Sequence, residues 1–587
     1  MFTKMTLPEK FFQQAQLRLD QKAFYYCRVR DSKWVSMTWK RYREEVCLLS
    51  SWLLAQGVNK GSKIALLSSN RPEWMIADLA ILSIGAISIP VYATSSQTDV
   101  TYILEHSGAE MLVVDQLEHI AYLQKTKLSA IVSFEKSPKK QIEAFAAKVH
   151  SLSTILHETK QTLHEPVALK NDDVATIIYT SGTTGKPKGV IHTHGNLAES
   201  MAASYDILET PEGTTDRYFS FLPLSHVAER QLVEIGSIMT GSEVAFARSI
   251  DTLGEDLLRC RPTILLCVPR LWEKIYEKIQ AGLLTASPIK RTVFAFARTL
   301  GEQRIEDDQI IRRAKDQSIG GIISDALVGR KMRGRLGLDR CRMLVTGAAP
   351  TRPEVMRFFG AFGMMIREVY GLTENLCCGV LNDAHEVVIG SCGKPFPGNE
   401  VRIAEDGEIM FRAPWMFKGY YKNPEATREV LSDDGWFATG DLGTMDSEGR
   451  LRIVGRKKEL LKTSGGKYVA PVPIEDSLKS HPIVKDAMII GDDKKYCVAL
   501  ISFETENAKA FDEDQRKDEI KKLLRRVNEP LASFESIKRV GVMKESFTVE
   551  NGALTPTLKV KRNVVVKQKE QFIERLYRSD DMVVYEA

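Results

Sequence analysis

Short apolar runs rich in β-branched side chains alternate with helical patterns from the N-terminus onward. The clearest runs cover residues 63–69, 87–93, 110–115, 264–269 and 342–350. Continuous apolar strands separated by helices are typical of parallel sheets with both faces covered. We therefore expect layered α/β structure to about residue 390.

The longest apolar stretch covers residues 74–93. An aspartate, a glycine and a proline interrupt it, whereas a membrane-spanning helix is longer and less polar. Proline suits the first turn of a helix, so we expect a helix that begins at Pro72 and ends near Gly85. A strand should follow at residues 87–91.

The pattern changes after residue 390. Alternating strands and glycine turns in residues 401–414 and 449–461 predict a β-rich, more antiparallel part. From about Glu459 a compact α+β segment should run to the end. Residues 281–335 have the charged amphipathic pattern of surface helices.

Composition narrows the function classes. The 587 residues carry a net charge of only +5, which makes no case for nucleic acid and leaves open a loose attraction to anionic membranes. A chain of this length should form at least two domains. Its first residues have no sustained apolar run, so no signal peptide is expected.

The cysteines and histidines indicate neither disulfides nor zinc. Nine cysteines without a CxxC pair favour a reduced, cytoplasmic setting. The adjacent Cys377 and Cys378 should be two small buried residues rather than a redox pair. The ten histidines form no HExxH pattern.

The strongest chemical signal is the segment Tyr179–Val190, YTSGTTGKPKGV, which follows an apolar run. Its glycines allow backbone N–H groups to face an anion, and its hydroxyls and lysines suit a polyphosphate. It is not a Walker A motif, because Lys186 is followed by proline. A plain surface hairpin is the alternative. The candidate ligands are Thr180, Ser181, Gly182, Thr183, Thr184, Gly185, Lys186 and Lys188.

This segment resembles the phosphate-loop signature of the adenylate-forming superfamily, which includes acyl-CoA synthetases, luciferases and peptide-synthetase adenylation domains. The resemblance extends over nearly the whole chain. It implies a large N-terminal domain of mostly parallel sheets with helices and a β-rich subdomain, residues 1–457. A small mobile α+β lid, residues 458–587, should follow.

Three further motifs resemble the nucleotide site of that superfamily. VTGAAP (345–350) and VYGLTEN (369–375) would contact adenine, and FATGDLG (437–443) would contact ribose. In the second motif Thr373 would donate to the α-phosphate, and Glu374 would hold Mg²⁺, which prefers oxygen ligands. The remaining residues implied at this site are Gly347, Ala348, Ala349, Tyr370, Gly371, Asp441 and Arg456.

FLPLSHVAER (221–230) resembles the segment that lines the acyl pocket, and it places His226 beside the substrate carboxylate. A structural role is the alternative for this single histidine.

The C-terminal motifs would carry the hinge, the CoA channel and the catalytic lysine. GRKKELLKTSGGKYVAP (455–471) resembles the hinge region, although a basic, glycine-bearing surface loop has the same appearance. The residues implied there are Lys458 at the hinge and Gly465, Gly466 and Lys467 beside the pantetheine chain. NGALTPTLKVKRN (551–563) resembles the terminal motif; counting back from Arg562 makes Lys559 catalytic, with Lys561 as the alternative.

The resemblance implies that ATP and a carboxylic acid give an acyl-adenylate, which then reacts with coenzyme A. The segments 268–279 and 554–562 look most like those of bacterial long-chain fatty acyl-CoA synthetases. Alternatives are an acyl-AMP ligase that loads a carrier protein, a ligase for short or aromatic acids, and a non-catalytic scaffold. The sequence specifies neither chain-length preference nor oligomeric state.

Overall fold

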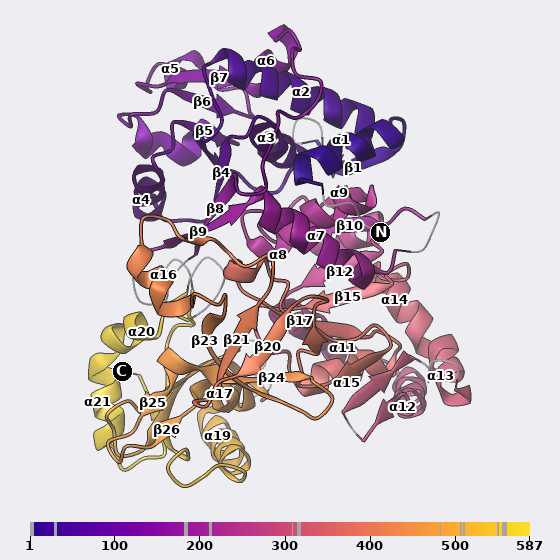
Figure 1. Ribbon diagram of the computed structural model, residues 1–587. Coiled ribbons are helices and arrows are strands. Elements are labelled where there is room, and N and C mark those ends of the chain that lie inside the picture. Colours follow the sequence, from indigo (N-terminus) through magenta and orange to yellow (C-terminus); the bar gives the residue numbers. More distant parts are fainter. Residues whose placement is uncertain are drawn as a thin grey trace.

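An eight-stranded sheet forms one layer of the N-terminal part (Figure 1). The computed structural model describes residues 5–28, 32–180, 186–210, 214–307, 309–313, 318–481, 483–504, 508, 511–548, 551–554 and 560–586. The strand order is β22-β9-β8-β4-β3-β5-β6-β7. The bounds are β3 Lys63–Leu67, β4 Ile87–Val91, β5 Met111–Val114, β6 Ala130–Ser133, β7 Lys148–Ser151, β8 Val174–Thr180, β9 Lys188–Thr193 and β22 Gly419–Tyr420.

The strands from β8 to β7 in this order are parallel, as the apolar runs of β3, β4 and β5 predict, whereas β9 pairs antiparallel with both β8 and β22. The helices of this part are α2 Trp39–Ala55, α3 Pro72–Ser83, α4 Gln97–Ser107, a 3-10 helix Leu117–Leu123, α5 Lys139–Ile142 and α6 Leu152–Glu158. The helix α3 begins at Pro72 and is buried at every position except Glu73, so the prediction for this apolar stretch is confirmed.

A nine-stranded sheet forms the second layer, in the order β19-β17-β16-β15-β12-β10-β11-β1-β2. Its strands are β1 Lys22–Cys27, β2 Trp34–Thr38, β10 Arg217–Ser220, β11 Glu243–Phe246, β12 Ile264–Cys267, β15 Met343–Thr346, β16 Ile366–Tyr370, β17 Val380–Leu381 and β19 Lys394–Pro395. The pairs from β1 through β11, β10, β12 and β15 to β16 are parallel. The carboxyl ends of β15 and β16 therefore lie at one edge, where ligands bind in open α/β sheets.

Helices cover this sheet and extend to one side of the molecule. They are α1 Leu7–Leu17, α7 His194–Leu208, α8 Val227–Glu229, a π-helix Arg230–Ile235, α9 Gly236–Thr240, α10 Leu253–Cys260, α11 Pro269–Leu284, α12 Pro288–Glu302, α13 Ile319–Ser324, a π-helix Asp325–Gly329, α14 Arg330–Leu336 and α15 Pro353–Ala361. The predicted helices of residues 281–335 are present. The expectation was incomplete, because the short strands β13 Ile305–Glu306 and β14 Ile310–Arg312 pair with each other, and β14 also pairs with β18 Glu386–Val388.

The predicted antiparallel part is a four-stranded sheet in the order β20-β21-β23-β24. Its elements are β20 Glu400–Ile403, β21 Glu408–Arg412, α16 Pro424–Val430, β23 Phe437–Met445 and β24 Leu451–Arg456. Short 3-10 helices at Thr373–Asn375 and Lys457–Glu459 precede and follow this part.

The C-terminal segment has its own sheet, β27-β28-β29-β30, and its own apolar clusters, all of whose members follow residue 460. A separate core is the physical mark of a separate domain. Its elements are β25 Leu461–Lys462, β26 Tyr468–Val469, α17 Pro471–Lys479, β27 Val484–Ile490, β28 Cys497–Phe503, α19 Glu513–Asn528, β29 Ile537–Val542, α20 Arg562–Gln568, α21 Glu570–Arg578 and β30 Val583–Tyr585.

All nine cysteines are free, as expected. Cys378 is buried, but Cys377 is only half-buried and has φ 57°, so the expectation of two buried residues was wrong for one of them. In the described part of the chain no helix combines the length and apolar character needed to cross a membrane.

Candidate functional site

The predicted phosphate loop connects two adjacent antiparallel strands. The strand β8 leads into it and β9 leads out, and Thr180 and Lys188 face each other across the pair. Ser181, Gly182, Thr183, Thr184 and Gly185 lie outside the described residues. At the exit, the Lys186 ammonium stands 5.1 Å from the ring centroid of Tyr102.

Glu374 is held by a tyrosine from the strand that joins the phosphate-loop hairpin. The Tyr420 hydroxyl donates to Glu374 Oε1 at 2.7 Å, and the Lys188 ammonium lies 4.7 Å from the Tyr420 ring centroid. Glu374 is 8% exposed, and burial raises the pKa of its carboxyl despite this hydrogen bond. A lysine, an aromatic ring and a carboxylate therefore lie in contact beside the loop.

Thr373 is positioned through its backbone. His192, at the end of β9, is fully buried, and its Nε2 lies 2.7 Å from the Thr373 carbonyl oxygen. Burial lowers the pKa of His192 to about 4, so the ring is neutral at physiological pH and donates from Nε2. This contact ties the 3-10 turn that bears Thr373 and Glu374 to β9.

Asp441 is the centre of a second polar group. Its Oδ2 accepts from the Tyr370 hydroxyl at 2.6 Å, and its Oδ1 accepts from Arg456 Nε at 2.8 Å. The hairpin register places Asp441 opposite Arg456, and burial is the largest influence on the raised pKa of Tyr370. A carboxylate has about four acceptor positions, so each oxygen retains one for another donor, an arrangement that suits the two hydroxyls of a vicinal diol.

The segment predicted to contact adenine follows β15. Gly347 is buried, and a Cβ there would come 2.8 Å from Val369 Cγ1, which permits only glycine without movement of the neighbouring chain. Ala348 has φ 72°, a left-handed conformation rare for alanine, and Ala348 and Ala349 are exposed. Gly371 is equally constrained, since its Cβ would stand 2.5 Å from Cys377 Cα.

His226 caps the short helix α8, with its Nδ1 accepting from the Ala228 N–H at 3.1 Å. Its ring lies edge-on to Tyr92, with centroids 6.3 Å apart. The structural interpretation of His226 thus has direct support from the cap, and the ring itself is half-buried.

The C-terminal candidates fall into two groups. Lys458 is exposed in the 3-10 helix after Arg456, and Gly465, Gly466 and Lys467 are exposed in the turn between β25 and β26. Lys559 lies outside the described residues. The Arg562 guanidinium, from which its register was counted, binds the Glu475 carboxylate at 2.5 and 2.6 Å.

These contacts bring together motifs that lie far apart in the sequence. Comparison with known proteins identifies the family of the chain. A family model described as AMP-binding enzyme matches residues 11–421, and one described as AMP-binding enzyme C-terminal domain matches residues 458–581. The chain belongs to the AMP-binding enzyme family. The predicted resemblance to adenylate-forming enzymes is therefore confirmed.

Several relatives match most of the chain, and two of them represent bacteria and plants. Long-chain-fatty-acid–CoA ligase FadD15 of Mycobacterium bovis is 32% identical over 96% of each chain. Long chain acyl-CoA synthetase 7, peroxisomal, of Arabidopsis thaliana is 33% identical over 92% of this chain and 81% of the plant protein.

Solved structures of lower identity share the fold. The adenylation domain of the carboxylate reductase from Mycobacterium chelonae has a TM-score of 0.78 at 22% identity, covering 98% of this chain and 91% of that one. The o-succinylbenzoate coenzyme A synthetase of Bacillus subtilis has a TM-score of 0.69 at 23% identity, covering 95% and 97%. The predicted α/β class with a separate C-terminal domain is thus confirmed.

For this AMP-binding enzyme, sequence reasoning missed two supporting residues. Neither Tyr420 nor His192 belongs to a motif that we singled out, and each acts on a residue more than forty positions away in sequence. The only local signal was that both lie in short strands beside glycine-bearing loops.

The residues present are suited to a magnesium ion that is bound jointly by the protein and by the phosphates of a nucleotide. Among described residues no group of three or more His, Cys, Asp or Glu side chains could hold a metal alone. Mg²⁺ usually takes one or two carboxylates, phosphate oxygens and waters. Glu374 offers such a carboxylate, with Oε1 bound to Tyr420 and further acceptor positions remaining.

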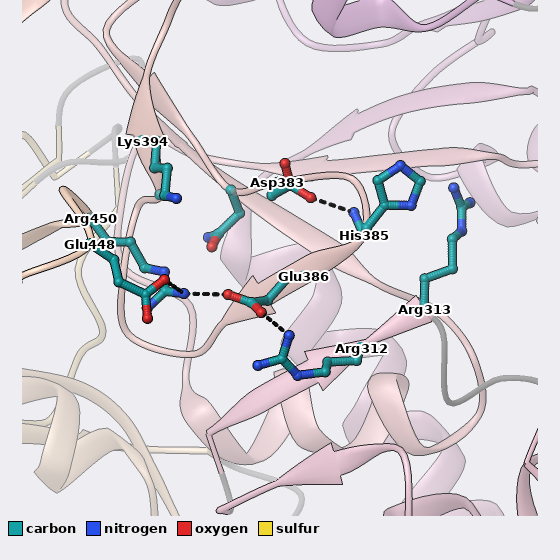
Figure 2. A pocket seen from close by; sticks show the side chains of 10 residues that line it. Arg312, Arg313, Asp383, His385, Glu386, Lys394, Glu448 and Arg450 are labelled. Carbon is teal, nitrogen blue, oxygen red and sulfur yellow. Dashed lines mark hydrogen bonds and ion pairs between the residues drawn. The ribbon is translucent and has the colours of Figure 1, made fainter.

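A cavity of about 630 Å³ lies elsewhere, among β14, β18 and the turn before β24. Figure 2 shows Arg312 and Arg450 directed at Glu386, and both guanidiniums pair with its carboxylate. The lining includes none of the predicted site residues. We infer that these ion pairs hold the strands together and take no part in the reaction.

Proposed function

We propose that this enzyme activates a long-chain fatty acid with ATP, forming an acyl-adenylate and pyrophosphate, and transfers the acyl group to coenzyme A. The observation that carries the proposal is the match to a long-chain-fatty-acid–CoA ligase over 96% of both chains. It covers the nucleotide motifs and the C-terminal domain together, and both are needed for a two-step reaction.

The nucleotide half of the proposal is supported by the two polar groups. Asp441 would accept from the ribose hydroxyls with the acceptor positions that Tyr370 and Arg456 leave available. Gly347 and its neighbours would lie against adenine, because Val369 prevents any side chain there. The phosphates would then extend toward Lys188 and the loop.

In the first step the fatty-acid carboxylate attacks the α-phosphorus and pyrophosphate leaves. Two anions must approach, so positive charge and fixed donors reduce the barrier. Thr373, positioned by His192, and the loop residues would supply donors. Mg²⁺, held by Glu374 and the phosphates, would neutralise charge on the nucleotide. His226 would stand beside the carboxylate.

We propose that the N-terminal domain ends at residue 457 and that a mobile lid begins at residue 458, with Lys458 as the pivot of the lid. The lid would bring Lys559 to the carboxylate for the first step. After rotation, Gly465 and Gly466 would make room for pantetheine, with Lys467 beside it. The CoA thiol would attack the acyl carbon of the acyl-adenylate, and AMP would leave as the thioester forms. The exposure of Lys458 and of the turn between β25 and β26 supports these roles.

We also propose a cytoplasmic enzyme in peripheral contact with the inner face of the membrane. Nine unpaired cysteines favour a reducing compartment. A fatty acid of long chain partitions into bilayers, so contact with a lipid surface would bring enzyme and substrate together.

The test is product analysis with ATP, Mg²⁺, CoA and a panel of carboxylic acids. We expect AMP, pyrophosphate and acyl-CoA, with palmitate greatly preferred over acetate. Formation of ADP would refute acyl-adenylate chemistry. Acyl-AMP without CoA turnover would indicate a carrier-protein ligase, and equal turnover of acetate and palmitate would refute only the long-chain assignment.

A further inference from the structure

An apolar surface that none of the described residues covers lies on the helices α12 and α13, at the lower right edge of the molecule in Figure 1. Of seventeen large exposed apolar residues in the described chain, eight fall between residues 284 and 327. Singly scattered apolar residues need no explanation, but a concentration of this kind indicates an interaction surface.

The helix α12 has two apolar faces, and only one is buried. Phe294 packs on Phe362, with ring centroids 5.1 Å apart, and Ala297 is fully buried. The other face carries Ile289, Val293 and Phe296 at spacings of four and three residues, 77%, 39% and 55% exposed.

The neighbouring helix continues this surface. A Cβ on Gly320 would come 2.1 Å from Gln303 Oε1, so α13 lies directly against the end of α12. Ile319 and Ile322 on α13 are 79% and 57% exposed, and Leu327 in the following π-helix is 38% exposed. We call the exposed apolar residues of 289–327 and the cations around them the α12–α13 surface.

Positive charge surrounds these apolar side chains. Residues 284–302 and 318–336 contain seven lysines and arginines but only two acidic residues, an excess equal to the net charge of +5 on the whole chain. Lys290, Arg291 and Lys331 are exposed. The remaining residues of the chain sum to no net charge.

We propose that the α12–α13 surface docks on the interface of an anionic phospholipid bilayer. Apolar side chains would enter the boundary between headgroups and acyl chains, and the cations would bind phosphate headgroups. A second copy of the chain fits less well, because a symmetric dimer would bring two like-charged surfaces together. The surface alone supports membrane docking. Only the benefit of docking, access to a substrate dissolved in the membrane, rests on the proposed function.

The test is flotation of the full-length protein with vesicles, in the absence of ATP, fatty acid and CoA. Each cation near an anionic surface contributes about a fivefold gain in binding. We expect strong binding to equal parts of phosphatidylcholine and phosphatidylglycerol, weak binding to phosphatidylcholine alone, and weakening at high salt. Reversal of Lys290, Arg291 and Lys331 to glutamate should reduce binding at least about a hundredfold.

The apolar contribution is tested by Ile289→Ser with Ile322→Ser, for which we expect at least about a tenfold loss. The matched control is Leu17→Ser with Ile250→Ser, which are 68% and 76% exposed elsewhere and should bind like the parent. The charge control reverses Lys125, Lys136 and Lys140, which are exposed in the segment around β6 and α5.

Equal effects of test and control variants, or equal binding to neutral vesicles, would overturn the proposal. Concentration-dependent dimerisation that the Ile289 and Ile322 changes abolish, without vesicle binding, would assign the surface to a second copy and also overturn it. Pyrophosphate release with a dispersed fatty acid should stay unchanged in the surface variants. Loss of vesicle binding with retained catalysis, or the reverse, separates this proposal from the proposed function.

Discussion

Removal of the Asp441 carboxylate should weaken ATP binding through the ribose. In the structure each carboxylate oxygen already accepts one hydrogen bond, from Tyr370 or Arg456, and retains one acceptor position. Hydrogen bonds to a charged group contribute about 1.5–3 kcal/mol. Asp441→Ala should therefore raise the KM for ATP by at least about tenfold and by up to roughly 150-fold, with a smaller effect on the acyl substrate.

Two comparisons separate ribose recognition from local disruption. Tyr370→Phe removes one partner of Asp441 but keeps the carboxylate and the ring, so the KM for ATP should change by less than about threefold. Dideoxy-ATP, which lacks both ribose hydroxyls, should bind the parent enzyme at least about tenfold less well than ATP. Asp441→Ala should scarcely distinguish the two nucleotides.

The assay is pyrophosphate release at saturating fatty acid, analysed as a cycle of enzyme variant against nucleotide. A melting curve for each variant shows whether the fold is retained. If Asp441→Ala discriminates against dideoxy-ATP as strongly as the parent enzyme does, Asp441 does not contact the ribose, and the assignment of its two remaining acceptor positions is refuted.

Three further predictions concern two lysines of the lid and one buried acid, Glu229. Lys559→Ala should slow pyrophosphate release roughly a thousandfold, because a charge about 4 Å from an anion contributes about 4 kcal/mol, but it should spare thioester formation from preformed acyl-AMP. Lys561→Ala should have a mild effect in both assays. If the two variants exchange these effects, Lys561 is the catalytic lysine. Lys458→Pro should spare adenylation and slow thioester formation, and equal loss in both half-reactions would exclude it as the pivot. Burial raises the pKa of Glu229 to about 8, so the folded protein keeps a proton that the unfolded chain releases. The stability from this group is fully present below about pH 4.5 and is lost as pH rises through about 8, and the free energy of unfolding should fall by roughly 3–5 kcal/mol over this range. Denaturant melts measure this fall in the parent enzyme, and Glu229→Gln should not show it.

The local pattern of apolar residues in the sequence was sufficient to predict the central strands of the two large sheets. The five apolar runs became β3, β4, β5, β12 and β15, all in parallel pairs, because a strand buried on both faces needs apolar residues at every position. The motif residues Asp441 and Arg456 could also be named from sequence, and their pairing follows from one hairpin.

Contacts between distant segments were not predictable from local pattern. The short strands β13 and β14 consist of two or three residues, too few to show a period, and they form a sheet with the distant strand β18, which pairs with β14. Likewise, no motif marks Tyr420 or His192. They act on Glu374 and Thr373 only because β9 and β22 pair next to the turn that follows β16.

The helices of residues 281–335 likewise combine a property that the sequence determines with one that only the tertiary structure determines. Their amphipathic pattern was visible in the sequence, and it predicted helices correctly. Periodicity states which residues share a face, but it does not state which face another element covers. Phe294 is covered because α15 lies beside it, whereas Ile289 and Phe296 on the adjacent face remain exposed. That difference arises only when the chain packs, since burial is a property of neighbours and not of a segment alone.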